Sequence, residues 1–212
     1  MITIHHLCKS QSDRVVWLME ELNLPYKLKW YERGPDLLAP KEFLALHPVA
    51  TAPVIEDDGQ ILVESGVIVE HICHRHAGGR FTVGPDQSNY TDYLYWMHFN
   101  NNVLGLFFAR TALGAEGSSP QCDMMRKVIE RREASYFRYL DQCLSRSAFA
   151  AGSEFTCADV MVMFNVASLP LFGGFRTQGM PNIQAYMKRI EERPAYQKAM
   201  QIAGPRASAP VV

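Results

Sequence analysis

The sequence has no excess of either charge and no closely spaced cysteines. It contains 21 Lys and Arg against 22 Asp and Glu, a formal net charge of -1, whereas a nucleic-acid partner favours a basic stripe. We therefore expect a small substrate and no nucleic acid. The five cysteines form no C-x-x-C pair, so neither a zinc knuckle nor a thioredoxin-type redox pair is indicated.

A secretory leader and a long apolar run are also missing. The chain starts with the strand-like MITIHHL, not with a basic segment followed by a long apolar one. Two long uncharged stretches, residues 93–109 and 160–175, are broken by three asparagines in the first and by a proline and a glycine pair in the second. Neither predicts a membrane span. Since scattered thiols fit a reducing compartment, we expect a cytoplasmic protein without a membrane partner.

The hydrophobic pattern changes character near residue 80. In order, the first part predicts a strand near 2–4, a helix over 15–22, a strand over 26–31, a short helix over 41–46, strands over 53–56 and 60–63, and a helix over 65–76. The second part predicts helices over 88–114, 121–145 and 157–169, and two shorter helices around Pro194. The predicted fold is therefore an α/β domain of order βαβαββα over 1–80, a linker over 81–87 and an all-helical domain over 88–212.

Ala52-Pro53 opens one of the predicted strands. Proline lacks the N–H that a sheet ladder needs, but the first residue of a strand tolerates it. A cis bond here would expose the backbone N–H and C=O of Ala52 for pairing with an extended peptide. An ordinary trans proline at the strand start is the alternative.

Two short segments lie where a strand is followed by a helix. Glu64-Ser65 offers a carboxylate for an ammonium group, and a helix N-terminus that attracts a carboxylate; together these match the free end of an amino acid. Residues 10–14 (SQSDR) place hydroxyls beside a helix N-terminus, which contributes positive potential. Ordinary helix capping explains either segment taken alone.

Together these segments resemble the thioredoxin-fold domain of cytosolic glutathione transferases. Residues 47–72 (HPVATAPVIEDDGQILVESGVIVEHI) match the family's proline turn, hairpin, acidic residue, serine and helix. The eleven-residue interval from Pro53 to Glu64 is the family spacing. Residues 155–159 (FTCAD) resemble a capping motif of the family's helical domain, in which Asp159 reaches back to the capping Thr156.

The resemblance implies an enzyme that binds glutathione and uses its sulfur as a nucleophile. Glu64 and Ser65 would hold the γ-glutamyl ammonium and carboxylate. Ala52, before a cis Pro53, would pair its backbone with the cysteinyl unit. Thr51 stands where many relatives have a lysine that helps to bind the glycine carboxylate, so it would donate a hydrogen bond there without a charge.

The resemblance also suggests which group stabilises the thiolate. The first tyrosine is Tyr26, which disfavours the tyrosine-dependent classes. Serine-type relatives usually carry the thiolate donor four residues before an arginine, and Ser10 stands four before Arg14. Ser10 is therefore the catalytic candidate and Ser12 the runner-up. Cys8 is a third option, because some relatives form a mixed disulfide with glutathione here, but it stands too early for a clean match.

For the second substrate the resemblance implies a small hydrophobic electrophile, with peroxide reduction as a further activity. The candidate residues of that pocket are Tyr95, His98, Asn102 and Phe108. The family also implies a homodimer and a role in detoxification. Two other functions stay open: a non-catalytic glutathione-binding or regulatory relative, and a glutathione-dependent disulfide reductase working through Cys8.

The histidines near residue 75 require a separate interpretation. His71 and His74 are three residues apart and share a helix face with each other, and Cys73 and His76 stand close by. The sequence indicates no further ligand, and cationic side chains are favoured at a helix C-terminus by the macrodipole. We therefore predict no metal.

Overall fold

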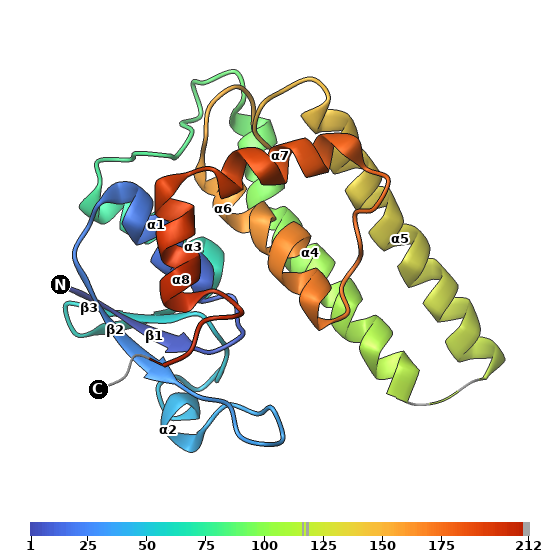
Figure 1. The fold of residues 1–212 in the computed structure, drawn as a ribbon, viewed down its shortest axis with the longest axis horizontal. Coiled ribbons are helices and arrows are strands. Elements are labelled where there is room, and N and C mark those ends of the chain that lie inside the picture. The colour runs from blue at the N-terminus through green and yellow to red at the C-terminus, as the bar shows by residue number, and fades with distance from the viewer. Residues whose placement is uncertain (116, 118, 210–212) are drawn as a thin grey trace. The chain divides into compact units, whose positions relative to one another are not determined.

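The computed structural model describes residues 1–115, 117 and 119–209 (Figure 1). The chain forms two compact units. The first contains Met1–Thr82 together with the chain from Ile190 onward, and the second contains Val83–Arg189. None of the helices in the described part of the chain combines the length and the apolarity that a bilayer crossing requires.

The first unit is built on a four-stranded sheet of order β2-β1-β3-β4. Its elements are β1 (Ile2–Leu7), α1 (Asp13–Leu22), β2 (Tyr26–Tyr31), α2 (Lys41–Leu44), β3 (Val54–Asp57), β4 (Gln60–Val63) and α3 (Ser65–His76). Strand β1 pairs with β2 in parallel and with β3 in antiparallel fashion, and β3 pairs with β4 in antiparallel fashion. This confirms the predicted βαβαββα order and the thioredoxin-like fold.

The strands follow the residue pattern that predicted them. Ile4 of β1 and Ile55 of β3 are fully buried on the two central strands of the sheet. Along β2, an outer strand, the side chains alternate between half-buried and exposed until Tyr31, which is buried. The β3–β4 hairpin turns at Asp58 and Gly59, which have φ values of 48° and 80°. Two positive φ values in succession fit a tight hairpin turn, and aspartate and glycine are residues that this turn favours.

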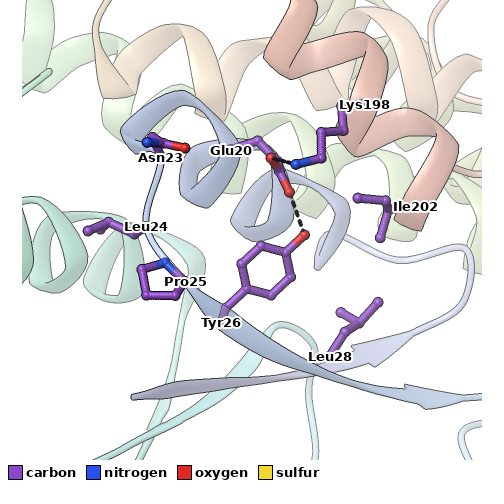
Figure 2. A pocket seen from close by; sticks show the side chains of 8 residues that line it. All are labelled: Glu20, Asn23, Leu24, Pro25, Tyr26, Leu28, Lys198 and Ile202. Atoms are coloured by element: carbon purple, nitrogen blue, oxygen red, sulfur yellow. Dashed lines mark hydrogen bonds and ion pairs between the residues drawn. The ribbon is translucent and has the colours of Figure 1, made fainter.

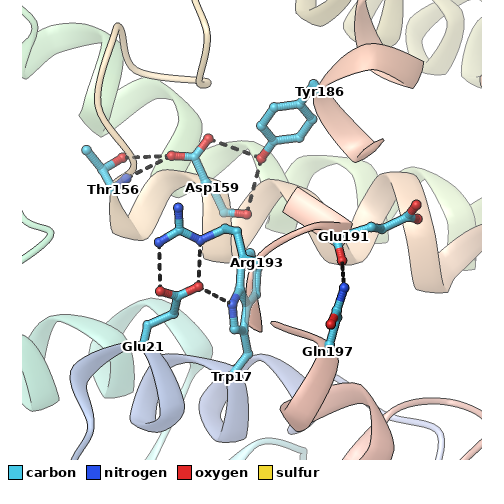
Figure 3. A network of polar contacts seen from close by, with 8 residues as sticks. All are labelled: Trp17, Glu21, Thr156, Asp159, Tyr186, Glu191, Arg193 and Gln197. Atoms are coloured by element: carbon cyan, nitrogen blue, oxygen red, sulfur yellow. Dashed lines mark hydrogen bonds and ion pairs between the residues drawn. The ribbon is translucent and has the colours of Figure 1, made fainter. Parts of the chain in front are cut away.

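Helix α8 (Pro194–Ala203) belongs to the first unit, whereas the sequence places all of 88–212 in one helical domain. It packs on α1. Arg193 donates from Nε and Nη2 to the two carboxylate oxygens of Glu21 at 2.6 and 2.7 Å, and the rings of Trp17 and Tyr196 meet edge to face at 4.8 Å. The bidentate pair is drawn in Figure 3. A fork-shaped pair of this kind fixes one helix against another with defined geometry.

The second unit is helical. Its elements are α4 (Tyr90–Ala115), α5 (Pro120–Leu144), α6 (Cys157–Met163), a π-helical turn (Phe164–Ser168), a 3-10 turn (Leu169–Phe172) and most of α7 (Pro181–Glu191). The predicted helix over 157–169 therefore changes its winding after Met163. Asp141 of α5 accepts hydrogen bonds from the backbone N–H groups of Asn182 and Ile183, which holds the first turn of α7 against α5.

The capping box that the sequence predicts at α6 is present. Asp159 is fully buried. Its carboxylate accepts hydrogen bonds from the N–H of Thr156 at 2.8 Å and the hydroxyl of Tyr186 at 3.1 Å (Figure 3), and from the N–H of Ala150 at 2.8 Å. Burial raises the pKa of Asp159 to about 6 although these donors act in the opposite direction. One carboxylate thus joins the loop before α6, the start of α6 and helix α7.

We expect Asp159→Asn to lower the free energy of unfolding by about 2–4 kcal/mol, because the amide nitrogen would face an N–H that needs an acceptor. Urea unfolding at pH 7.5, followed by circular dichroism, measures the change. Thr156→Ser keeps the capping hydroxyl and serves as the matched control, with an expected loss below about 1 kcal/mol. Equal stability of Asp159→Asn and the wild type would contradict this account.

Candidate functional site

The sheet register brings three loops of the first unit to one edge. His5 of β1 pairs with Val54 of β3, and Val54 pairs with Val63 of β4. Because β3 runs antiparallel to both neighbours, the C-terminal ends of β1 and β4 lie at the same edge of the sheet as the N-terminal end of β3. The segments around Ser10, Ala52-Pro53 and Glu64-Ser65 follow or precede these three strand ends, so the structure brings these predicted site segments to one edge.

The proline turn has the geometry that the resemblance implies. The peptide bond between Ala52 and Pro53 is cis. Pro53 is buried, Ala52 is half-buried and Thr51 is exposed. The backbone of Ala52 therefore lies at the sheet edge, separated only by Pro53 from the first paired residue of β3, Val54.

Glu64 has a backbone conformation that few residues other than glycine adopt. Its φ and ψ are 71° and 115°, and its side chain is exposed. A non-glycine residue in such a region is held by its surroundings against a cost of about 1–3 kcal/mol, and residues of this kind cluster at ligand clamps. With this conformation, Glu64 is exposed to solvent between the end of β4 and Ser65, the first residue of α3.

Ser65 is buried and joined to a buried cation. Its hydroxyl accepts a hydrogen bond from Nη1 of Arg14 at 3.3 Å, and Arg14 is 1% exposed. Burial lowers the pKa of Arg14 to about 10, so the guanidinium remains charged at neutral pH. A carboxylate at the N-terminus of α3 would meet both the helix dipole and this positive charge. Sequence reasoning used Arg14 only as a spacing marker and missed this contact.

A chain of hydrogen bonds runs from the interior to Ser10. The Ser10 hydroxyl lies 2.7 Å from the carbonyl oxygen of Leu7 and 2.8 Å from the hydroxyl of Ser12. The Ser12 hydroxyl lies 2.8 Å from Nδ1 of His6. Ser12 and His6 are both fully buried, whereas Ser10 is half-buried. Ser10 therefore forms the outer end of the chain.

The direction of these hydrogen bonds follows from their acceptors. A carbonyl oxygen can only accept, so Ser10 donates its single hydrogen to Leu7. The Ser12 hydroxyl also lies 3.3 Å from the Leu7 carbonyl, but its contact with Ser10 is shorter at 2.8 Å. Ser12 therefore donates to Ser10, and Nδ1–H of His6 donates to Ser12. Burial lowers the pKa of His6 to about 4, so its ring is neutral. Its Nε2 has no hydrogen-bond partner in the described part of the chain and carries only a lone pair. Sequence reasoning missed His6; a histidine at an inward position of a buried strand is the signal that could have found it.

Cys8 lies in a less reactive setting. It is 7% exposed, and the backbone N–H of Arg33 donates to its sulfur at 3.4 Å. Burial raises the pKa of the Cys8 thiol, although the hydrogen bond acts in the opposite direction. The fraction of nucleophilic thiolate at neutral pH is therefore small.

The residues predicted for an electrophile pocket all lie exposed on α4. At about 100° per residue, Tyr95, His98 and Asn102 share a sector of about 60°, and Phe108 lies about 80° beyond it. The ring of Tyr95 meets that of Tyr139 at 5.5 Å. Three of the four residues thus form one face of the helix.

Two hollows in the structure lie elsewhere. One of about 580 Å³ is lined by residues of α1, β2, α8 and the turn after α1: Glu20, Asn23, Leu24, Pro25, Tyr26, Leu28, Lys198 and Ile202 (Figure 2). The carboxylate of Glu20 binds both the hydroxyl of Tyr26, at 2.8 Å, and Nζ of Lys198, at 2.7 Å. The other hollow, of about 180 Å³, is lined by Arg110, Glu130, Glu133, Gly174 and Phe175.

Comparison with known proteins gives matches over both halves of the chain. Residues 5–80 match the family model for the N-terminal domain of glutathione S-transferases, and residues 108–200 match that for their C-terminal domain. Glutathione S-transferase 3 of Schizosaccharomyces pombe is 29% identical over 211 residues, which cover 92% of this chain and 85% of that protein.

Solved structures agree with this assignment. A glutathione S-transferase from Actinobacillus pleuropneumoniae is 30% identical and superposes with a TM-score of 0.83, covering 97% of this chain and 95% of that one. A theta-class glutathione S-transferase from Xanthomonas axonopodis pv. citri, solved with glutathione bound, is 22% identical with a TM-score of 0.70, covering 96% of this chain and 98% of that one. With both family domains matched in order, this chain belongs to the glutathione S-transferase family.

Proposed function

We propose that this transferase conjugates the thiolate of glutathione to small hydrophobic electrophiles, with Ser10 as the residue that stabilises the thiolate. The observation that carries the proposal is the hydrogen-bond chain from His6 through Ser12 to Ser10. In this series of hydrogen bonds the hydroxyl of Ser10 is the outermost group, and its hydrogen is the one that a ligand could accept. That hydroxyl follows β1 at the sheet edge that also carries the cis proline turn and Glu64-Ser65.

The energetic requirement on Ser10 is modest. A free thiol has a pKa of about 8.5, so only a few per cent is thiolate at neutral pH. Lowering that pKa by about two units requires about 2.7 kcal/mol of preferential stabilisation of the anion. A donated hydroxyl and the N-terminus of α1 are the available sources. Because Ser10 already accepts from Ser12, its own hydrogen is polarised toward the acceptor that replaces the Leu7 carbonyl.

The remaining groups suit the peptide part of glutathione. Glu64 offers a carboxylate to the γ-glutamyl ammonium, and Ser65, with Arg14 behind it, suits the γ-glutamyl carboxylate. The backbone of Ala52 before the cis Pro53 suits the cysteinyl unit, and Thr51, which is exposed, suits the glycine carboxylate. We assign glutathione binding to these residues.

The second substrate and the assembly belong to the same proposal. We assign the electrophile pocket to Tyr95, His98, Asn102 and Phe108 on α4 and propose a homodimer in the cytoplasm with a detoxifying role. Peroxide reduction is a further activity of the same thiolate. The burial of Cys8 argues against a disulfide reductase that works through that residue.

In Ser10→Ala we expect kcat for conjugation of an activated aryl halide to fall about 10²- to 10³-fold, as on removal of one donor to a developing anion. The thiolate absorbance of bound glutathione, titrated against pH, gives the second readout. In the wild type the bound thiol should ionise about two pKa units below the free thiol, and Ser10→Ala should restore the free value. A wild-type thiol pKa that does not move on binding would point to the non-catalytic relative.

Ser12→Ala is the matched control for this experiment. It removes the donor to Ser10 and leaves Nδ1–H of His6 without an acceptor, so we expect a lower stability, by about 1–3 kcal/mol, with a smaller loss of kcat than in Ser10→Ala. If Ser12→Ala lost activity while Ser10→Ala kept it, the assignment of the thiolate donor would be reversed.

For the peptide contacts we expect Glu64→Gln and Ser65→Ala each to raise KM for glutathione by about tenfold or more, because a hydrogen bond to a charged group contributes about 1.5–3 kcal/mol. Thr51→Lys, at an exposed position, adds the missing cation and should lower KM by about two- to fivefold, the range of an exposed ion pair. Steady-state kinetics at fixed electrophile concentration measure all three. An unchanged KM in Glu64→Gln would remove that residue from the site.

A further inference from the structure

Three side chains with metal-binding atoms meet at the edge of the sheet opposite to the proposed glutathione site. Asp57 is the last residue of β3, and His71 and His76 lie on α3. Nε2 of His71 and Nε2 of His76 lie 2.8 and 2.6 Å from the same oxygen, Oδ2 of Asp57. All three atoms lie within 4.8 Å of one another.

The sequence predicts no metal here because it places His71 and His74 on one helix face and indicates no further ligand. His71 and His76 are five residues apart, which separates them by about 140° around a regular helix. His76 is the last residue of α3, and Asp57 is the last residue of β3, just before the hairpin turn. His74 points elsewhere and binds Glu70 at 3.0 Å. Only the tertiary fold therefore brings the three groups together.

The burial of the three groups differs in a way that suits an ion arriving from solvent. The side chain of Asp57 is 4% exposed, whereas those of His71 and His76 are 24% and 27% exposed. The second carboxylate oxygen of Asp57, Oδ1, is buried and has no hydrogen-bond partner among the residues that the structure describes. A buried carboxylate with one unsatisfied oxygen favours a nearby cation over neutral partners, and the exposed imidazole edges leave room for water as a further ligand.

We propose that Asp57, His71 and His76 form a binding site for a divalent transition metal ion of the Zn²⁺ type, completed by water. Two imidazoles and one carboxylate with an open position form a ligand set that Zn²⁺ accepts. The two neutral rings and the carboxylate carry a charge of about -1, so the divalent ion leaves a net charge of about +1. The C-terminus of α3 adds negative potential at this point.

A tetrahedral ion requires both imidazole rings to move. Ligand atoms at about 2.0–2.1 Å from a tetrahedral zinc stand about 3.3 Å apart, so the two N–O separations of 2.8 and 2.6 Å must widen by about 0.5–0.7 Å. The two Nε2 atoms, which lie within 4.8 Å of each other, must also come to this separation. Both rings are partly exposed to solvent, which permits the movement. Each ring would then present the lone pair of Nε2 to the ion and carry its hydrogen on Nδ1.

The site stands apart from the proposed chemistry. Ser65 and His76 are the first and last residues of α3, about 16 Å apart along the helix axis. A bound ion would join the β3–β4 hairpin to the end of α3 and stabilise the folded first unit by mass action. The proposal does not depend on which residue activates glutathione.

The test is a calorimetric titration of the full, untagged chain with Zn²⁺ at pH 7.5. We expect one equivalent to bind and to raise Tm, and His71→Ala and His76→Ala each to weaken binding at least about tenfold and to remove the rise in Tm. His74→Ala, on the same helix but outside the cluster, is the matched control and should bind as the wild type does. Circular dichroism shows that each variant is folded.

Substitution with Co²⁺ identifies the ligands by a route that does not depend on stability. We expect a visible d–d spectrum of a nitrogen and oxygen site that is lost in His71→Ala and His76→Ala. A strong near-ultraviolet thiolate-to-cobalt band would assign the ion to the cysteines and overturn the proposal. Absence of Zn²⁺ binding in the wild type, or equal affinity in all four proteins, would overturn it as well.

Discussion

The antiparallel pairing of β3 with both β1 and β4 decides where the functional groups of the first unit lie. It gathers the ends of three strands at one edge, where the loop of Ser10, the cis proline turn and Glu64-Ser65 follow. It also sends the other end of β3, with Asp57, to the opposite edge and the end of α3. One register thus separates the group of residues that suits a peptide from the group that suits a metal ion.

Buried polar side chains link this arrangement to chemistry. His6 and Ser12 are both fully buried, and Arg14 is 1% exposed. Each presents a hydrogen toward the residue that lies nearer to the edge: His6 to Ser12, Ser12 to Ser10, and Arg14 to Ser65. Because a buried donor without an acceptor is costly, these contacts hold Ser10 and Ser65 in place before any ligand arrives. In this unit the interior therefore orients the groups at the edge.

The features that were predicted correctly from the sequence depend on local residue patterns or on a motif of a known family. The strand alternation in β2, the Asp58-Gly59 turn and the capping box at Asp159 depend on neighbours in the chain, and the structure confirms each. The cis bond before Pro53 followed from the family resemblance and not from the dipeptide. The functional roles assigned to Ser10, Glu64 and Ser65 stay predictions, although the structure places their segments at one edge.

What the sequence missed depends on long-range packing. Nothing local shows that His6 supports Ser12, that Arg14 reaches Ser65 across 51 positions, or that Asp57 meets His76. The place of α8 was missed for the same reason, since the partner of Arg193 is Glu21, 172 positions earlier.

The packing of α8 on α1 affects the order in which the first unit can fold. The first unit is discontinuous in the chain, so a ribosome delivers α1 long before α8, and Trp17 can contact Tyr196 only after the whole second unit has been synthesised. The sheet can form early, but the first unit is completed only by a segment that follows the second unit in the chain, which makes its folding sensitive to loss of α8.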